Sequence, residues 1–326
     1  MKLIVDIDIK SPPEKISYDH SLFLIGSCFT EHIGGRLADL KFPVLQNPNG
    51  ILFDPLSVCT SLLSYVEPKE YTGADLFYLN ELWQSWQHHS MFSGMDKQQV
   101  VNHINQSQQE AHHFLQKAGW MIVTLGSAFS YQLLENGMSV ANCHRAPGQW
   151  FKKRLAGIAE IINRLEDTIE KLKAFNPALK IIFTISPVRH LRDGVIDNNR
   201  SKARLLEAVH QVVEHYDHCI YFPAYELVID VLRDYRFYDI DLAHPNYAAT
   251  EYVFEKFRES FIDKNAHRLM DEVKQLMTAY KHKPFQPSTE AHKNFLRTSL
   301  EKTNRLQQQL PHLDFSKEIR FFSGAS

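Results

Sequence analysis

Two short stretches of this sequence carry side chains that can act together as a nucleophile and its base. Ser27 follows the apolar run 22–25 and a glycine, and Asp241 precedes His244 by three residues. A serine hydroxyl becomes a nucleophile when a neutral imidazole accepts its proton, and a carboxylate can fix the tautomer and orientation of that imidazole. If the fold brings the two stretches together, they predict a catalytic triad of Ser27, His244 and Asp241.

Each of these residues also has a simpler explanation. A serine after glycine at the end of a strand is commonly a turn residue, and a histidine before proline is commonly the start of a helix. Cys28 is an alternative nucleophile beside Ser27. Because neighbours along an extended segment face opposite ways, we expect Cys28 to pack into the core while Ser27 faces the site.

The composition indicates an ordinary globular chain. It has 326 residues, 44% of them hydrophobic, and a formal net charge of -2. That charge argues against a nucleic-acid partner, and no apolar run approaches the roughly 20 residues of a membrane helix. Acidic residues interrupt the N-terminus too early for a signal-peptide core. The four cysteines are scattered and form no C-x-x-C pair, which predicts reduced thiols in a cytoplasmic protein.

The hydrophobic pattern predicts alternating strands and helices, and hence a three-layer α/β/α sandwich around a parallel sheet. Five strands suit the flavodoxin-like order 2-1-3-4-5, in which ligands bind beside the first strand at the carboxyl edge. The expected strands are 22–25, 44–45, 121–126, 180–185 and 219–222, with a hairpin at 131–140. The expected helices are 31–40, 55–66, 97–118, 151–175, 201–215 and one that begins near Pro245.

Two segments fall outside this pattern. Residues 67–96 are rich in aromatic residues and histidine, and we expect an insertion over the top of the sheet. Residues 264–326 change to polar helices, one of which carries a leucine stripe. The sequence therefore predicts a main domain at 1–263 and a C-terminal helical appendage at 264–326, through which the chain can associate into oligomers.

The stretch from Gly26 to Thr30, Gly-Ser-Cys-Phe-Thr, resembles the signature of the GSCFA family, with threonine where the family name has alanine. The likeness runs from about Leu22 to Phe261. Further similar stretches are 47–52, 140–144, 186–190 and 233–238. The family in turn resembles the SGNH (GDSL-type) hydrolase superfamily, whose fold is the sandwich expected above.

The resemblance implies roles for individual residues. Ser27 matches the nucleophile of the superfamily, and Asp241 and His244 match its D-x-x-H motif. Gly50 matches the glycine whose N–H joins that of Ser27 in the oxyanion hole. The superfamily has glycine followed by x-Asn-Asp in its third block, whereas this chain has Gly-Ser-Ala at 126–128. A third oxyanion donor therefore has to come from Ser127 or from elsewhere, with Asn142 as one option.

Loops that should follow the rim of the sheet supply the expected pocket residues, which are His89, His144, Arg189 and His190. Trp83 and Trp86 can either stack on a sugar ring or form a packed aromatic lid. No histidine or cysteine spacing matches a recognised metal motif, so we expect neither a metal nor another cofactor.

The leading hypothesis is a serine hydrolase or acyltransferase that acts on a small-molecule or carbohydrate ester, such as an O-acetylated sugar. The alternative is a catalytically silent protein that binds a carbohydrate or small molecule on the same fold.

Overall fold

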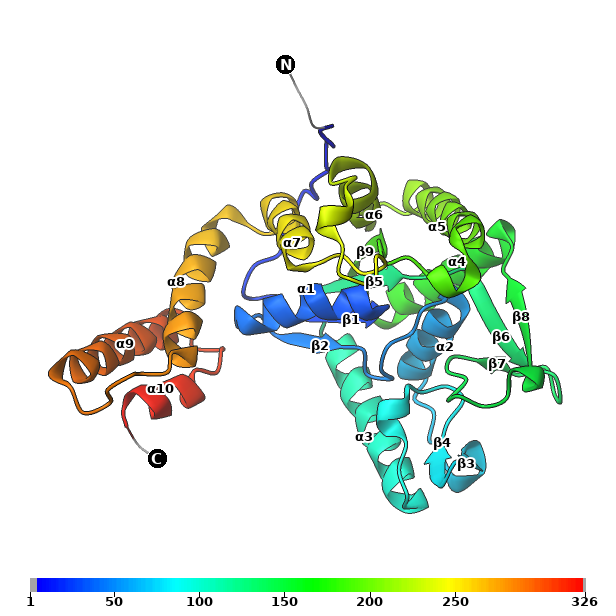
Figure 1. The fold of residues 1–326 in the computed structure, drawn as a ribbon, viewed down its shortest axis with the longest axis horizontal. Helices are drawn as coiled ribbons and strands as arrows, with labels where there is room; N and C mark the ends of the chain where they lie inside the picture. The colour runs from blue at the N-terminus through cyan, green and yellow to red at the C-terminus, as the bar shows by residue number, and fades with distance from the viewer. Residues whose placement is uncertain (1–4, 325–326) are drawn as a thin grey trace.

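A five-stranded parallel sheet forms the centre of the chain, in the order β10-β9-β5-β1-β2 (Figure 1). The computed structural model describes residues 5–324. The strands are β1 (Leu22–Gly26), β2 (Val44–Gln46), β5 (Trp120–Leu125), β9 (Lys180–Ile185) and β10 (Cys219–Tyr221). Numbered within this sheet alone, the order is 2-1-3-4-5, so the predicted α/β sandwich is confirmed.

Helices cover both faces of the sheet because alternate residues of each strand point to opposite sides. In β1, Leu22 and Leu24 belong to one core, and Phe23 and Ile25 belong to the other. The first core is covered by α1 (Cys28–Asp39) and α7 (Tyr247–Phe261). The second is covered by α2 (Pro55–Val66), α3 (Lys97–Leu115), α4 (Ile158–Phe175) and α5 (Val195–His215). Short helical turns lie at 224–226, 227–231 and 235–237.

The helix expected over 151–175 is only partly correct. Residues Phe151–Leu155 form strand β8, which pairs with β6 (Phe129–Leu133), and β7 (Ser139–Val140) completes a small antiparallel sheet. The sequence of 151–155, Phe-Lys-Lys-Arg-Leu, does not alternate, and its pairing with β6 makes it a strand; Gly157 is then the N-cap of α4.

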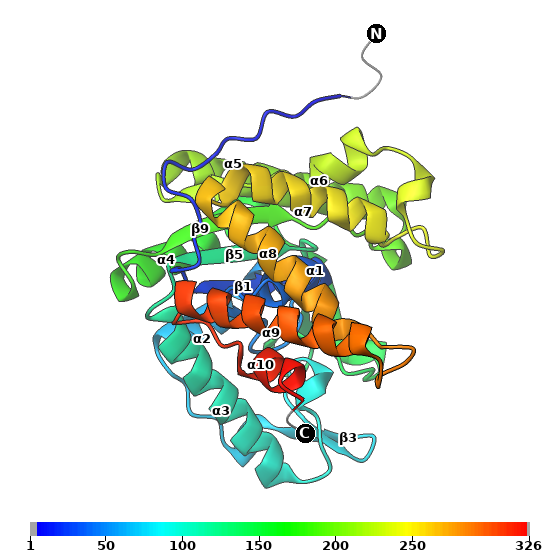
Figure 2. The same cartoon turned by 90° about the vertical axis from the view of Figure 1, so that its left-hand side faces the viewer.

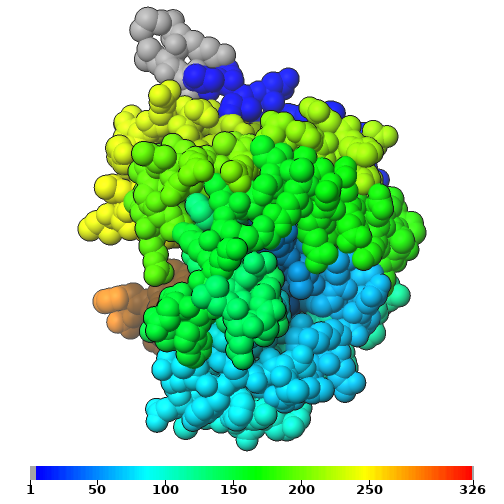
Figure 3. Space-filling model, turned by 90° about the vertical axis from the view of Figure 1, so that its right-hand side faces the viewer, coloured from blue at the N-terminus to red at the C-terminus, as the bar shows by residue number. Residues whose placement is uncertain are grey.

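The aromatic segment 67–96 packs against this small sheet. It contains the hairpin β3 (Phe77–Leu79) and β4 (Leu82–Gln84). The Phe77 and Trp86 rings stack with their centroids 3.5 Å apart, and Trp86 also contacts Phe151 of β8. Figure 3 shows the face on which this segment, in cyan, adjoins the green strands.

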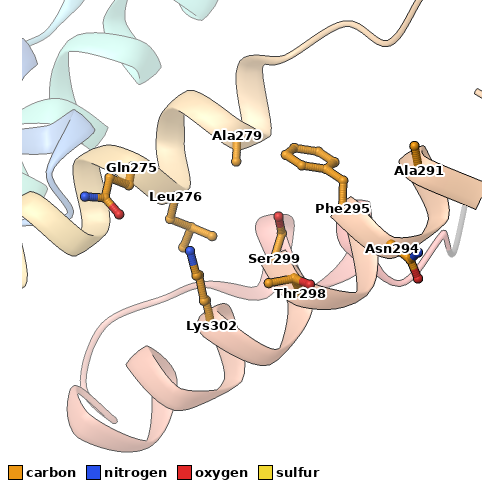
Figure 4. A pocket seen from close by; sticks show the side chains of 9 residues that line it. All are labelled: Gln275, Leu276, Ala279, Ala291, Asn294, Phe295, Thr298, Ser299 and Lys302. Carbon is orange, nitrogen blue, oxygen red and sulfur yellow. The ribbon is translucent and has the colours of Figure 1, made fainter. Parts of the chain in front are cut away.

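The C-terminal region forms three helices, α8 (Lys264–Lys281), α9 (Glu290–Gln309) and α10 (Ser316–Phe322). The third was not predicted from the sequence. In Figure 2, α8 runs from the end of α7 toward α9 and α10. Met270, Val273, Leu306 and Phe315 are buried in the same core as Leu22 and Leu24, so these helices pack on the α/β domain. A cavity of about 380 Å³ lies between α8 and α9 (Figure 4).

Two smaller expectations concern cysteines and membranes. All four cysteines lie in the described part of the chain and are unpaired. Across residues 5–324, no helix has the length and apolar character needed to cross a bilayer.

Candidate active site

Ser27 lies at the turn from β1 into α1, at the carboxyl edge of the sheet. It is 1% exposed, and it is the N-cap residue of α1, although its side chain makes no capping hydrogen bond. Among the described residues its Oγ has no hydrogen-bond partner. The first N–H groups of a helix carry partial positive charge. An oxygen nucleophile at this position therefore lies beside groups that stabilise negative charge.

Gly26 makes this turn possible. Its φ is +136°, and a Cβ at this position would lie 2.0 Å from the carbonyl oxygen of Thr124 in β5. The Gly26 N–H donates to Asn47 Oδ1 at 2.9 Å, and its carbonyl accepts from Leu52 at 3.0 Å. The backbone that presents Ser27 is therefore held on several sides.

We expect Gly26→Ala to destabilise the protein strongly, because the new methyl group has no space against backbone atoms of β5. The matched control is Gly35→Ala in α1, where nothing lies within 4 Å of the added Cβ. In a helix interior this control should be neutral or stabilise by about 0.5–1 kcal/mol. Urea denaturation of both variants measures the difference. Equal midpoints would show that the turn is not sterically constrained.

Asp241 and His244 form a tight pair on the loop that precedes α7. His244 Nδ1 lies 2.5 Å from Asp241 Oδ2, and Asp241 Oδ1 accepts the backbone N–H of His244 at 3.0 Å and of Ala243 at 2.9 Å. These backbone hydrogen bonds, and the side-chain bond to His244, lower the pKa of Asp241 to about 2. An ionised carboxylate only accepts hydrogen bonds, so Nδ1 carries the proton and Nε2 keeps its lone pair. That is the tautomer a general base requires.

The structure does not join Ser27 and His244 by a hydrogen bond, since Ser27 Oγ has no partner within residues 5–324. Both residues instead lie near His190 and the residues that contact it. Gly126 contacts Ser27 closely enough that an added Cβ would lie 3.1 Å from Ser27 Cβ. The His190 ring contacts Phe53 edge-on, and the N–H of the neighbouring Arg189 donates to Ala243 O, next to His244. Catalytic hydrogen bonds are commonly long before substrate binds and tighten in the complex.

The two backbone N–H groups expected in the oxyanion hole already have acceptors inside the protein, and Ser127 and Asn142 also make side-chain hydrogen bonds. The N–H of Ser27 donates to Thr124 O at 3.0 Å, and that of Gly50 donates to Asn47 O at 2.7 Å. Ser127 Oγ lies 3.3 Å from Ser201 Oγ and accepts the N–H of Phe129, and Asn142 Oδ1 accepts the N–H of His144. In this conformation a substrate oxyanion would have to share or displace the hydrogen bonds of the Ser27 and Gly50 N–H groups.

The Gly-Ser-Cys-Phe-Thr stretch thus forms a tight strand-to-helix turn with a buried serine, as its family signature implies. A family model described as the GSCFA family matches residues 21–257, well over half of the chain. The chain belongs to the GSCFA family. A second model, described as the C-terminal domain of GSCFA domain proteins, matches residues 273–324. No curated protein matches the chain.

In this GSCFA protein, the four expected pocket residues separate into two groups. Arg189 and His190 lie beside the Asp241–His244 loop. The Arg189 guanidinium lies 4.5 Å from the centre of the Tyr238 ring, and the backbone N–H of Arg189 donates to Ala243 O at 3.1 Å. Arg189 therefore helps to hold the Asp241–His244 loop in place. Burial, together with the Lys202 charge, lowers the pKa of His190 to about 4, which keeps this ring neutral at pH 7.

His89 and His144 lie elsewhere. His144 is buried among aromatic rings, with its Nε2 2.7 Å from Ser85 O and its ring against Phe77 and Trp86. His89 begins a short helical turn, and its Cβ adjoins Gly50. The structure therefore gives His144 a packing role, whereas His89 lies against the loop that carries Gly50.

The two tryptophans also differ in accessibility. Trp86 is 9% exposed and stacked on Phe77, so its face is not available to a sugar ring. Trp83 packs against Tyr78, and Lys97 Nζ lies 4.3 Å from the centre of the Trp83 ring.

In the described part of the GSCFA chain, no group of three or more His, Cys, Asp or Glu residues is placed to hold a metal ion.

Sequence reasoning did not identify Phe53 and Lys202. Phe53 contacts His190 edge-on, with ring centroids 5.7 Å apart, and a Cβ added at Gly126 would lie 3.3 Å from Phe53 Cδ1. Lys202 is fully buried behind the same glycine. The helical spacing could have indicated the burial of Lys202. It lies three residues before Leu205 and seven before Val209, which places it on the apolar face of α5 with these buried residues.

Proposed function

We propose that this GSCFA protein is a serine hydrolase or acyltransferase of SGNH type that acts on an acyl ester, such as an O-acetylated carbohydrate. The observation that carries this proposal is the Asp241–His244 pair. A carboxylate that binds Nδ1 at 2.5 Å leaves Nε2 as the proton acceptor. The loop of this pair contacts Arg189, next to His190, and Gly126 packs against the Ser27 side chain, whose hydroxyl has no partner among the described residues.

In the proposed reaction, Ser27 Oγ attacks the ester carbonyl while His244 Nε2 takes the hydroxyl proton. Asp241 remains ionised and stabilises the imidazolium that forms. His244 then returns the proton to the leaving alkoxide, which leaves an acyl group on Ser27. Water or a second alcohol releases that acyl group in a second step, and the choice between them decides between hydrolase and transferase.

The domain assignment and the location are parts of the same proposal. Residues 1–263 supply the catalytic α/β domain, and residues 264–326 form its helical extension. The four unpaired cysteines fit a reducing compartment, in agreement with a cytoplasmic protein.

The second candidate is a catalytically silent binding protein. It is favoured by the engaged N–H groups of Ser27 and Gly50, and by the absence of an asparagine after Gly126. Loss of one oxyanion donor typically costs about 10²–10³ in rate.

A fluorescent fluorophosphonate probe tests the proposal, because it phosphonylates activated serines and needs no knowledge of the substrate. We expect the wild-type protein to be labelled and Ser27→Ala to be unlabelled on a fluorescence gel. The heat-denatured protein is the control. Absence of labelling in the native protein would favour the binding protein.

A further inference from the structure

Lys202 is a buried cation that contacts the Gly126 backbone beside Ser27. It lies on α5 and is 1% exposed, and its Nζ donates to the carbonyl oxygens of Gly126 and Ser186, each at 2.6 Å. Within residues 5–324 it forms no ion pair with a carboxylate. An ammonium group has three N–H donors, so two carbonyls leave one donor and the full charge uncompensated. Such a group is costly to bury, which calls for a function.

The position of this cation relates it to Ser27. Gly126 directly follows β5, and Ser186 directly follows β9, so Lys202 ties together the carboxyl ends of two neighbouring strands. Gly126 packs against Ser27, and the Lys202 charge also interacts with Cys28, the next residue along the chain. Lys202 is therefore close to Ser27, whose hydroxyl is the proposed nucleophile.

We propose that Lys202 is a positioning residue of the Ser27 site, whose ammonium charge replaces the asparagine donor missing after Gly126 and stabilises the negative charge that develops on the substrate oxygen. This inference rests on the proposed serine hydrolase function. Lys202 acts through the Gly126 loop and through its electric field, which is effective because Lys202 and Ser27 are both buried, where the dielectric constant is low.

The protonation of Lys202 separates this electrostatic role from a structural one. Burial lowers the pKa of Lys202 to about 7. A neutral amine still has two N–H groups, which suffice for the Gly126 and Ser186 carbonyls, so loss of the proton leaves the structural bridge intact. Only the charge and the third donor are lost as the pH rises through about 7.

Two titratable groups face Lys202 from neighbouring elements, Cys28 on α1 and His190 after β9. Burial raises the pKa of Cys28 above its ordinary value of 9, and the pKa of His190 is about 4. Around neutral pH the Cys28 thiol therefore stays protonated and His190 stays neutral, so Lys202 is the member of this group that changes charge there.

The test is the second-order rate constant for phosphonylation of Ser27 by the fluorophosphonate probe, measured in the full-length protein from about pH 5.5 to 9.5. We expect the wild-type rate to fall on the alkaline side, from about pH 7–8. Lys202→Arg keeps its charge throughout, so its rate should not fall. Lys202→Met lacks the charge, so its rate should be lower by about 10–100-fold at pH 6.5 and show no alkaline fall. Cys28→Ser is the matched control and should keep the wild-type profile.

The outcomes distinguish the inference from the function on which it rests. Labelling of Ser27 with a wild-type rate that keeps rising to pH 9.5 would overturn the role of Lys202 and leave the serine hydrolase intact. The same holds if Lys202→Met reacts at the wild-type rate, or if Lys202→Arg retains the alkaline fall. If neither Lys202 variant folds, the wild-type and Cys28→Ser profiles decide. Absence of Ser27 labelling at every pH would overturn both proposals.

Discussion

Replacing Ser27 or His244 with alanine should each remove nearly all turnover of an ester substrate, and the double variant should be little worse than either. Residues that act as one nucleophilic unit are strongly non-additive, because the loss of one leaves the other without a task. We expect losses on the order of 10⁴–10⁶ in kcat for each single variant. Asp241→Asn should cost less, because it leaves both the nucleophile and the imidazole in place.

A general ester such as an aryl acetate suffices for this measurement, since all variants are compared on the same substrate. His113→Ala is a suitable control, because His113 is exposed on α3 and has no part in the proposed site. If the losses for Ser27→Ala and His244→Ala multiply in the double variant, the two residues do not share a step. Activity that survives Ser27→Ala but is lost on chelation would place the chemistry at a metal.

Deleting residues 264–326 should make the remaining chain unstable or prone to associate. The C-terminal helices contribute side chains that are 0–2% exposed to the core shared with the sheet, including Met270, Val273 and Phe315. Burial of each such side chain contributes about 1.5–3 kcal/mol. Together they are comparable with the roughly 5–15 kcal/mol that stabilises a whole domain.

Polar contacts join the same surfaces. Lys41 forms an ion pair with the buried Glu318 at 2.8 Å, and His312 Nε2 donates to Tyr18 O at 2.9 Å. Truncation would therefore also remove hydrogen-bond and ion-pair partners of Tyr18 and Lys41.

Point variants make the same prediction without truncation. Phe315→Ala should cost about 3–5 kcal/mol, because its ring is fully buried. Phe285→Ala is the control, since this ring is 94% exposed and should change stability by less than about 0.5 kcal/mol. Thermal unfolding and light scattering of all three proteins provide the comparison. A truncated protein that stays monomeric with an unchanged midpoint would show that the tail is an independent appendage.

The fold was largely predictable from the sequence because its signals are local. Apolar runs such as 22–25 and 181–185 form the buried strands, and strands separated by helices predict a parallel sheet, for which five strands suit the observed order 2-1-3-4-5. The helix expected over 151–155 was wrong because five residues before a long helix are easily taken for its first turn. Only the pairing of β8 with β6, which joins distant residues, settles it. Helix α10 was missed because it has just seven residues.

The candidate site was predictable only where the reactive residues are close together in the sequence. Asp241 and His244 are three residues apart, so their contact follows from one loop. The hydrogen bonds that occupy the N–H groups of Ser27 and Gly50 depend on β5 and on the turn at 47–50, which no local pattern reveals. Lys202 is far from Ser27 along the chain, and only the fold places its ammonium beside Gly126.

The most direct test of the account is peptide mapping of the native protein after reaction with the fluorophosphonate, to find the residue that carries the phosphonyl group. The account predicts a single adduct on Ser27, in the wild-type protein and equally in Cys28→Ser. Burial raises the pKa of the Cys28 thiol, so it stays protonated at neutral pH and is a weak nucleophile. An adduct on Cys28, or none on the native protein at any pH from about 6 to 9, would contradict the account.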